Sequence, residues 1–118
     1  MGLGMFFLDT YAFVALDKES KNYWRFRDVD AVTTRFNQAE YGWLLIKEGK
    51  PLDIEKLEPY IFEVNSEIVK NALRLRKKHK NMSMPDAIGY ATSVYLTILF
   101  VTGDSDFKGL PNVLFFEE

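Results

Sequence analysis

The sequence contains no cysteine, a single histidine and no long apolar segment, and each absence argues against a class of protein. Without cysteine there is no disulfide framework and no thiolate zinc site, which fits a reducing compartment. The longest apolar runs are far shorter than the roughly 20 residues that a membrane-spanning helix requires, and the chain starts without a basic, signal-like segment. We therefore expect a cytoplasmic protein without a membrane segment.

A basic excess is also lacking. Lysine and arginine number 15 against 17 aspartate and glutamate residues, which gives a formal net charge of -2. Nucleic-acid-binding proteins commonly carry a positive balance, so this average argues against a generally basic surface, although it can hide a local one. The 118 residues suffice for one domain that removes about two-thirds of its unfolded surface from water, and we expect a single domain over residues 1–118.

Two apolar segments run directly into aspartate residues and predict the centre of the fold. Residues 98–101, Ile-Leu-Phe-Val, precede Thr-Gly-Asp-Ser-Asp, and residues 5–8, Met-Phe-Phe-Leu, precede Asp-Thr. Continuous apolar runs of this length are typical of parallel strands that are covered on both faces. Because ligands of open parallel sheets gather at the carboxyl ends of the strands, we expect Asp9 and Asp104 to meet at one edge.

The rest of the chain predicts alternating helices and strands. Short strands are expected at 31–34, 61–64 and 113–116, and helices at 11–16, 38–48, 53–60, 66–80 and from 83 to the strand at 98. Ser83 is followed by a proline and an acid, as at many helix starts. Asn37 stands three residues before Glu40, which is the spacing of a capping box. This alternation implies a three-layer α/β/α sandwich around a parallel sheet.

Five carboxylates fall where this topology places strand ends and helix starts: Asp9, Glu40, Asp86, Asp104 and Asp106. Each has an ordinary structural explanation as a cap, a turn former or a strand end. Two carboxylates about 4 Å apart, however, repel by roughly 1 kcal/mol in water and by more at lower dielectric. A cluster of acids persists at neutral pH by retaining protons or by holding a divalent cation, and oxygen ligands alone favour Mg²⁺ or Mn²⁺ over zinc.

The order and flanks of these acids resemble the PIN domain, in particular the short stand-alone form found in VapC-type toxins. The motifs that carry the resemblance are residues 8–10 (Leu-Asp-Thr), 38–40 (Gln-Ala-Glu), 85–91 (Pro-Asp-Ala-Ile-Gly-Tyr-Ala) and 101–107 (Val-Thr-Gly-Asp-Ser-Asp-Phe). Together they cover essentially the whole chain. The resemblance implies an α/β/α sandwich, metal-dependent endoribonuclease activity and a cognate antitoxin that silences the enzyme.

The resemblance also implies a role for each acid. Asp9, Asp86 and Asp104 would bind Mg²⁺ or Mn²⁺ directly or through water. Glu40 would complete the catalytic pocket, and Asp106 would be a more variable fifth acid. The implied reaction is hydrolysis of an RNA phosphodiester by a metal-activated water, without a side-chain nucleophile.

Residues near the acids have weaker signals. By the same resemblance, Thr10 and Thr102 would support the metal-binding carboxylates through hydrogen bonds. The single histidine, His79, lies in a basic run at 74–80, where a surface position is favoured over a role as general base. That run either opposes the dipole of a helix C-terminus or contacts RNA phosphates. The candidate RNA-binding residues are Arg74, Lys77 and Lys78.

Alternative functions stay open at this point. The same metal site would also suit a nuclease for structured DNA, and a PIN-like module without activity would bind only its antitoxin. A receiver-type or phosphatase-type pocket is disfavoured, because such sites place two acids at the first strand and Asp9 stands alone. Aromatic residues exceed what a core of this size needs, which predicts an interface and a homodimer. These aromatic residues include Tyr23, Trp24, Phe26, Trp43 and Tyr60.

Overall fold

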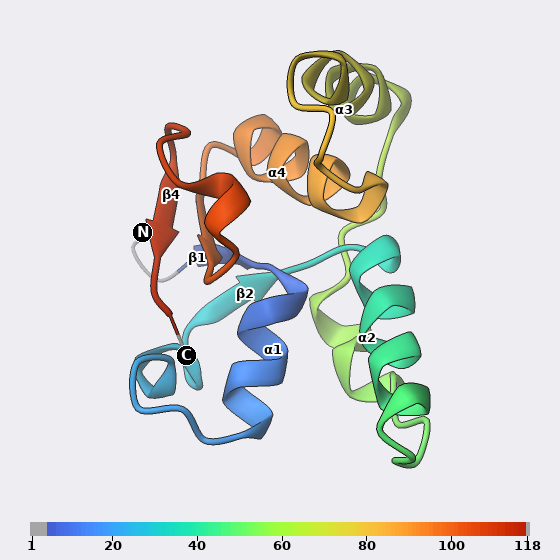
Figure 1. The fold of residues 1–118 in the computed structure, drawn as a ribbon, viewed down its shortest axis with the longest axis vertical. Coiled ribbons are helices and arrows are strands. Elements are labelled where there is room, and N and C mark those ends of the chain that lie inside the picture. The colour runs from blue at the N-terminus through green and yellow to red at the C-terminus, as the bar shows by residue number, and fades with distance from the viewer. Residues whose placement is uncertain (1–4, 118) are drawn as a thin grey trace.

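A computed structural model describes residues 5–117, which form an α/β sandwich around one parallel sheet (Figure 1). The four strands lie in the order β2-β1-β3-β4. Their bounds are Met5–Leu8 for β1, Asp30–Val32 for β2, Leu99–Thr102 for β3 and Val113–Phe115 for β4. The predicted three-layer architecture is therefore confirmed. Residues 1–4 and 118 of the expected domain lie outside the described residues.

In the part of the chain that the structure describes, four α-helices cover the two faces of the sheet (Figure 1). Their bounds are Thr10–Asp17 for α1, Arg35–Lys47 for α2, Ser66–Lys78 for α3 and Met84–Leu96 for α4. In the same described region, the connecting segments contain three short 3-10 helices: η2 at Trp24–Phe26, η3 at Glu55–Tyr60 and η4 at Ser105–Phe107. Within residues 5–117, no helix combines the length and apolar character that crossing a membrane demands.

Alternation along the central strands divides the core into two halves. Phe7 of β1 pairs with Phe100 of β3, and their rings stack 5.3 Å apart in the half that contains α3 and α4. The next residues, Leu8 and Val101, pack in the other half with α1 and α2. Because successive side chains of a strand point to opposite faces, two apolar residues in a row supply both halves. Both strands end at the same edge, β1 immediately before Asp9 and β3 immediately before Gly103 and Asp104.

The predicted capping box at Asn37 is wrong. Helix α2 begins at Arg35, and its cap is Thr34, whose extended backbone lets the hydroxyl accept from the backbone N–H of Asn37. Thr34 therefore takes the capping position, and Asn37 already has helical neighbours on both sides. The Asn37 side chain is fully buried and does not cap the helix.

The strand predicted at 61–64 is also wrong. Ile61 forms only an isolated parallel bridge with Thr33, supported by the hydrogen bond from Phe62 N to Thr33 O at 2.8 Å. The bridge extends no further because the chain turns into α2 directly after Thr34. Residues 53–60, expected as a helix, contain the 3-10 helix η3, with Pro59 inside it.

Candidate active site

The first acid is fixed by the strand that precedes it and the helix that follows it. Asp9 directly follows β1 and caps α1 by accepting a hydrogen bond from Thr10 N on Oδ1 at 2.8 Å. Its other oxygen, Oδ2, accepts from the Thr102 hydroxyl at 2.7 Å. Only 2 % of Asp9 is exposed. The carboxylate is therefore held from two sides in a nearly dry position.

Thr102 connects two of the acids. While its hydroxyl donates to Asp9, the same oxygen accepts from the backbone N–H of Asp104 at 3.0 Å. Asp104 in turn caps η4, because its Oδ1 accepts from Asp106 N at 2.9 Å. The adjacency of β1 and β3 thus brings Asp9 and Asp104 to one edge of the sheet, as their positions in the sequence predict.

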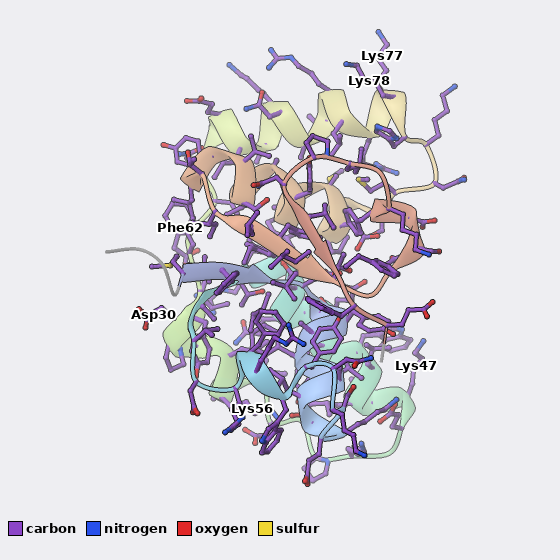
Figure 2. All side chains as sticks on the ribbon, turned by 90° about the vertical axis from the view of Figure 1, so that its left-hand side faces the viewer. Asp30, Lys47, Lys56, Phe62, Lys77 and Lys78 are labelled. Atoms are coloured by element: carbon purple, nitrogen blue, oxygen red, sulfur yellow. The ribbon has the colours of Figure 1, made fainter. Side chains whose placement is uncertain are left out.

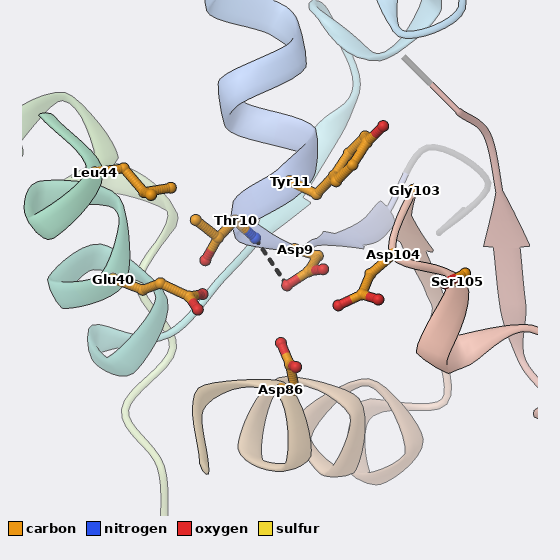
Figure 3. A pocket seen from close by; sticks show the side chains of 9 residues that line it. All are labelled: Asp9, Thr10, Tyr11, Glu40, Leu44, Asp86, Gly103, Asp104 and Ser105. Atoms are coloured by element: carbon orange, nitrogen blue, oxygen red, sulfur yellow. Dashed lines mark hydrogen bonds between the residues drawn. The ribbon is translucent and has the colours of Figure 1, made fainter. Parts of the chain in front are cut away.

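Two further acids come from helices that flank this edge (Figure 3). Glu40 lies on α2, and Asp86 lies in the first turn of α4, where Ser83 caps the helix. Together with Asp9 they form a group in which one carboxylate oxygen from each residue lies within 4.8 Å of the others. The sequence predicts a metal set of Asp9, Asp86 and Asp104, whereas the group found among residues 5–117 contains Glu40 in place of Asp104.

The acids border a hollow of about 400 Å³, which we call the acidic hollow. Figure 3 shows the carboxylates of Glu40, Asp86 and Asp104 directed toward the region of Asp9. Tyr11 and Leu44 contribute apolar surface. The complete lining is Asp9, Thr10, Tyr11, Glu40, Leu44, Asp86, Gly103, Asp104 and Ser105.

Proximity and burial change the acidity of two members. Burial is the main reason that the pKa of Asp9 rises to about 8, and the neighbouring Asp86 carboxylate adds to the effect. The pKa of Asp86 rises to about 6, first through burial and then through repulsion from Glu40. Without a cation, Asp9 therefore retains its proton at neutral pH. A divalent ion would replace that proton, because its charge stabilises the ionised form.

Sequence reasoning missed Asn37 as a member of this site. Its amide Nδ2 lies 3.0 Å from Thr10 Oγ1 and 3.4 Å from Asp9 Oδ1, and it donates to both. The amide oxygen accepts from the Thr34 hydroxyl at 2.7 Å, which fixes the orientation of the group. The only signal in the sequence is Thr34, a competing cap three residues earlier that leaves Asn37 without a capping role.

Other predicted site residues lie outside the acidic hollow. Asp106 is exposed on η4 and borders a different hollow. Arg74, Lys77 and Lys78 are exposed on α3, which packs on α4, and Figure 2 shows Lys77 and Lys78 at the end of that outer helix. Thr10 donates to Asp9 through its backbone N–H, and Thr102 donates to it through its hydroxyl.

The donor set fits a hard divalent cation. All the side chains that converge are carboxylates, and their oxygens lie close enough together to share one ion. Among residues 5–117, the acidic hollow contains no histidine, so the oxygen-only set favours Mg²⁺ or Mn²⁺. Such an arrangement can hold a metal ion against a phosphate group at an open edge of the protein.

Comparison with protein families gives a match to the PIN domain. The model of the PIN domain matches residues 6–113, which includes every acid discussed above. A sequence search of curated proteins gives no significant match.

Solved structures with a similar fold include chains from toxin-antitoxin systems. A toxin-antitoxin complex from Klebsiella pneumoniae contains a chain with 19% identity and a TM-score of 0.78, and the match covers 96% of this chain and 99% of that one. VapC20 of Mycobacterium tuberculosis, a toxin that cleaves the sarcin-ricin loop, has 18% identity and a TM-score of 0.73, with coverage of 92% and 96%. VapBC2 of Rickettsia felis, bound to a promoter DNA fragment, has 14% identity and a TM-score of 0.68, with coverage of 97% and 98%.

Proposed function

Since the chain belongs to the PIN domain family, we propose that it is an endoribonuclease that depends on Mg²⁺ or Mn²⁺. The observation that carries the proposal is the convergence of Asp9, Glu40 and Asp86, with oxygens within 4.8 Å of one another, at the carboxyl edge of a parallel sheet. Bringing these charges together is costly without a cation, as the raised pKa of Asp9 illustrates. A structural cap or turn does not require such a cluster.

The residues in and beside the acidic hollow would have different roles in hydrolysis. Asp9, Glu40 and Asp86 would hold the cation, and Asp104 would border the phosphate from the η4 side. Thr102 and Asn37 orient the Asp9 carboxylate. The cation, when bound, supplies charge neutralisation for the phosphodiester and lowers the pKa of the attacking water.

Cleavage of a mixed RNA pool tests this proposal. We expect cleavage in Mg²⁺ or Mn²⁺, no cleavage in EDTA, and a decrease of at least about a hundredfold in Glu40→Gln and Asp86→Asn. The matched control is Asp30→Asn, because Asp30 is an exposed acid at the start of β2 (Figure 2). Metal-independent cleavage, or full activity in both amide variants, would contradict the proposal.

The same assay separates the alternatives. A preference for branched or flapped DNA over RNA would indicate a structure-specific DNA nuclease. Absence of cleavage of any substrate, with binding to an antitoxin intact, would indicate an inactive PIN-like module. The activity of VapC20, cleavage of the sarcin-ricin loop, supports RNA as the first substrate to test.

We further propose that the enzyme is the toxin of a toxin-antitoxin pair and acts in the cytoplasm, where its RNA substrates lie. Its similarity in fold to chains of two toxin-antitoxin complexes supports this assignment. Expression in a bacterial host should arrest growth, and Asp86→Asn should abolish the arrest. Co-expression of the neighbouring reading frame should restore growth of the wild type, and its product should co-purify with the enzyme.

A homodimer is also proposed, with α2 at its interface. The outer face of α2 carries an exposed apolar stripe, which we call the α2 stripe: Phe36, Ala39, Trp43 and Ile46. Its spacing of three, four and three residues is that of a coiled coil. In an antiparallel pairing with a second copy, Phe36 faces Ile46 and Ala39 faces Trp43. The stripe is therefore self-complementary, with a small residue opposite a large one.

Of the aromatic residues expected at an interface, Tyr23 and Phe26 instead belong to the core. Trp43, by contrast, is 57% exposed. Sedimentation should show a dimer for the wild type and a monomer for Trp43→Glu. Trp24→Glu, also at an exposed tryptophan but outside the α2 stripe, should remain dimeric. A monomeric wild type at high concentration would contradict the proposal.

A further inference from the structure

A second hollow, of about 270 Å³, opens between the end of α3 and η4. We call it the basic hollow. Its lining combines basic and polar side chains with one apolar and one acidic side chain: Lys78, His79, Lys80, Asn81, Met82 and Asp106. Among residues 5–117, no carboxylate oxygen lies within 4.0 Å of the ammonium group of Lys78 or Lys80. Two lysines therefore border this hollow without an ion pair.

Two hydrogen bonds hold the backbone that forms one wall of the basic hollow. Arg76 Nε donates to Met82 O at 3.0 Å, and Met82 N donates to His79 O at 3.0 Å, which closes a tight turn around Lys80 and Asn81. The Met82 side chain is buried in the core beneath this turn. The backbone of Lys80 therefore lies in a turn that is anchored at both ends beside the hollow.

The two hollows share two structural elements. Ser105 of η4 borders the acidic hollow, and its neighbour Asp106 borders the basic one. The entry to α4 is shared in the same way, because Met82 lines the basic hollow and Asp86 the acidic one. A chain of phosphates that lies over the acids can therefore continue past η4 and the start of α4 into the basic hollow.

We infer that the basic hollow binds a phosphate of the RNA strand next to the one that is cut, with Lys78 and Lys80 as the residues that contact it. This inference rests on the proposed ribonuclease function and adds the path of the substrate. Lysine ammonium groups without carboxylate partners, next to the Asn81 amide, offer donors to phosphate oxygens. The inference also reduces the set of predicted RNA-binding residues. Of the three candidates Arg74, Lys77 and Lys78, only Lys78 borders this hollow.

Asp106 belongs to the opposite wall and lowers the positive charge of the basic hollow. Two lysines against one carboxylate still leave a net positive lining at neutral pH. Asp106 is exposed, so water screens its repulsion of a bound phosphate. In the absence of a cation, the carboxylates of the neighbouring acidic hollow repel phosphate. The lysines of the basic hollow attract phosphate and so offset this repulsion.

The test is binding of a short, fluorescein-labelled 2′-O-methyl oligoribonucleotide, measured by anisotropy in EDTA. The 2′-O-methyl groups prevent cleavage through the 2′-hydroxyl and EDTA removes the cation, so the result does not depend on activity. Lys78→Ala/Lys80→Ala should weaken binding about tenfold and reduce the slope of log K against log salt by about 0.7 for each phosphate that is no longer neutralised. The matched control, Arg74→Ala/Lys77→Ala, removes the same charge from the outer face of α3 and should change affinity less than about twofold.

Equal decreases in affinity in the two double variants would show that net charge alone attracts the probe, and would overturn the inference. Unchanged affinity in Lys78→Ala/Lys80→Ala, or no binding by the wild type, would also overturn it. If the difference between the variants holds but the wild type cleaves no RNA, the proposed activity fails and the binding site stands. Circular dichroism of both double variants checks that each remains folded.

Discussion

Asp9 is the residue whose environment most clearly departs from that of an ordinary surface acid. It is buried, hydrogen-bonded on both oxygens, and next to two other carboxylates. Its pKa of about 8 means that the folded protein binds a proton which the unfolded chain, with a pKa of 3.8, has already released. The metal-free protein should therefore lose stability with rising pH.

The pH dependence of the free energy of unfolding tests the raised pKa of Asp9. In EDTA, the free energy of unfolding should fall from about pH 4 toward pH 8, because a raised carboxyl pKa stabilises the fold only while the acid stays protonated. One proton corresponds to a slope of up to about 1.4 kcal/mol per pH unit. Urea titrations should show the fall in the wild type and a flatter profile in Asp9→Asn. Stability that rises with pH across this range in both proteins would contradict the assignment.

Asn37 acts on the site through Asp9 and Thr10. Asn37→Leu keeps the volume but removes the donors to both residues and the acceptor of the Thr34 hydroxyl. We expect a decrease of about 1–3 kcal/mol in the free energy of unfolding, because buried polar groups are left unpaired. Mn²⁺ affinity should also fall, since the Asp9 carboxylate is no longer oriented.

The control for this change is Asn71→Leu, at an exposed asparagine of α3 whose side chain contacts only Arg74 in the described part of the chain. It should alter stability by less than about 0.5 kcal/mol and leave Mn²⁺ affinity unchanged. Equal effects of the two substitutions would show that Asn37 has no positioning role. Chemical denaturation and calorimetric Mn²⁺ titration supply the two readouts.

A site residue can be predicted from the sequence when the local sequence pattern marks its position, and not when only tertiary packing does. Asp9, Asp86 and Asp104 could be found because each stands at a strand end or helix start that local pattern reveals. Asn37 could not, since an asparagine near a helix start has the same sequence signature whether it caps or points inward. Only the packing of α2 against α1 and α4 distinguishes the two cases.

At the level of elements, helix ends explain most differences between expectation and structure. Helix α2 starts three residues earlier than predicted because Thr34 supplies the cap, and the strand expected at 61–64 is one bridge because its neighbour β2 is short. The type and order of the long elements followed from apolar periodicity. Their exact ends depend on single hydrogen bonds that compete within a few residues.

The C-terminus of α4 offers a test at this scale. Thr97 adopts a left-handed conformation, with φ 57° and ψ 47°, which is unfavourable for a β-branched residue. Thr97→Gly should therefore raise the free energy of unfolding by about 1 kcal/mol. Thr97→Ala retains the Cβ atom and should gain less. A decrease in stability in Thr97→Gly, measured by urea denaturation, would show that the threonine side chain contributes more than its strain costs.

For the whole molecule, the layer order could be predicted, whereas the grouping of residues into surface patches and hollows could not. Apolar strands that run into acids indicate a parallel sheet and its functional edge. The sequence pattern does not reveal the α2 stripe, because α2 carries apolar residues on both its buried and its exposed sides. The basic hollow likewise arises from a turn and η4, which are distant in sequence and meet only in the fold.

The whole account depends on the acidic hollow being a binding site for a divalent cation. Calorimetric titration of the wild type with Mn²⁺ near neutral pH measures this directly, beside Asp9→Asn, Asp86→Asn and the control Asp30→Asn. We predict saturable binding by the wild type and Asp30→Asn, and a decrease of at least about tenfold in affinity in the other two variants. No binding by the wild type, or equal affinity in all four proteins, would contradict the account.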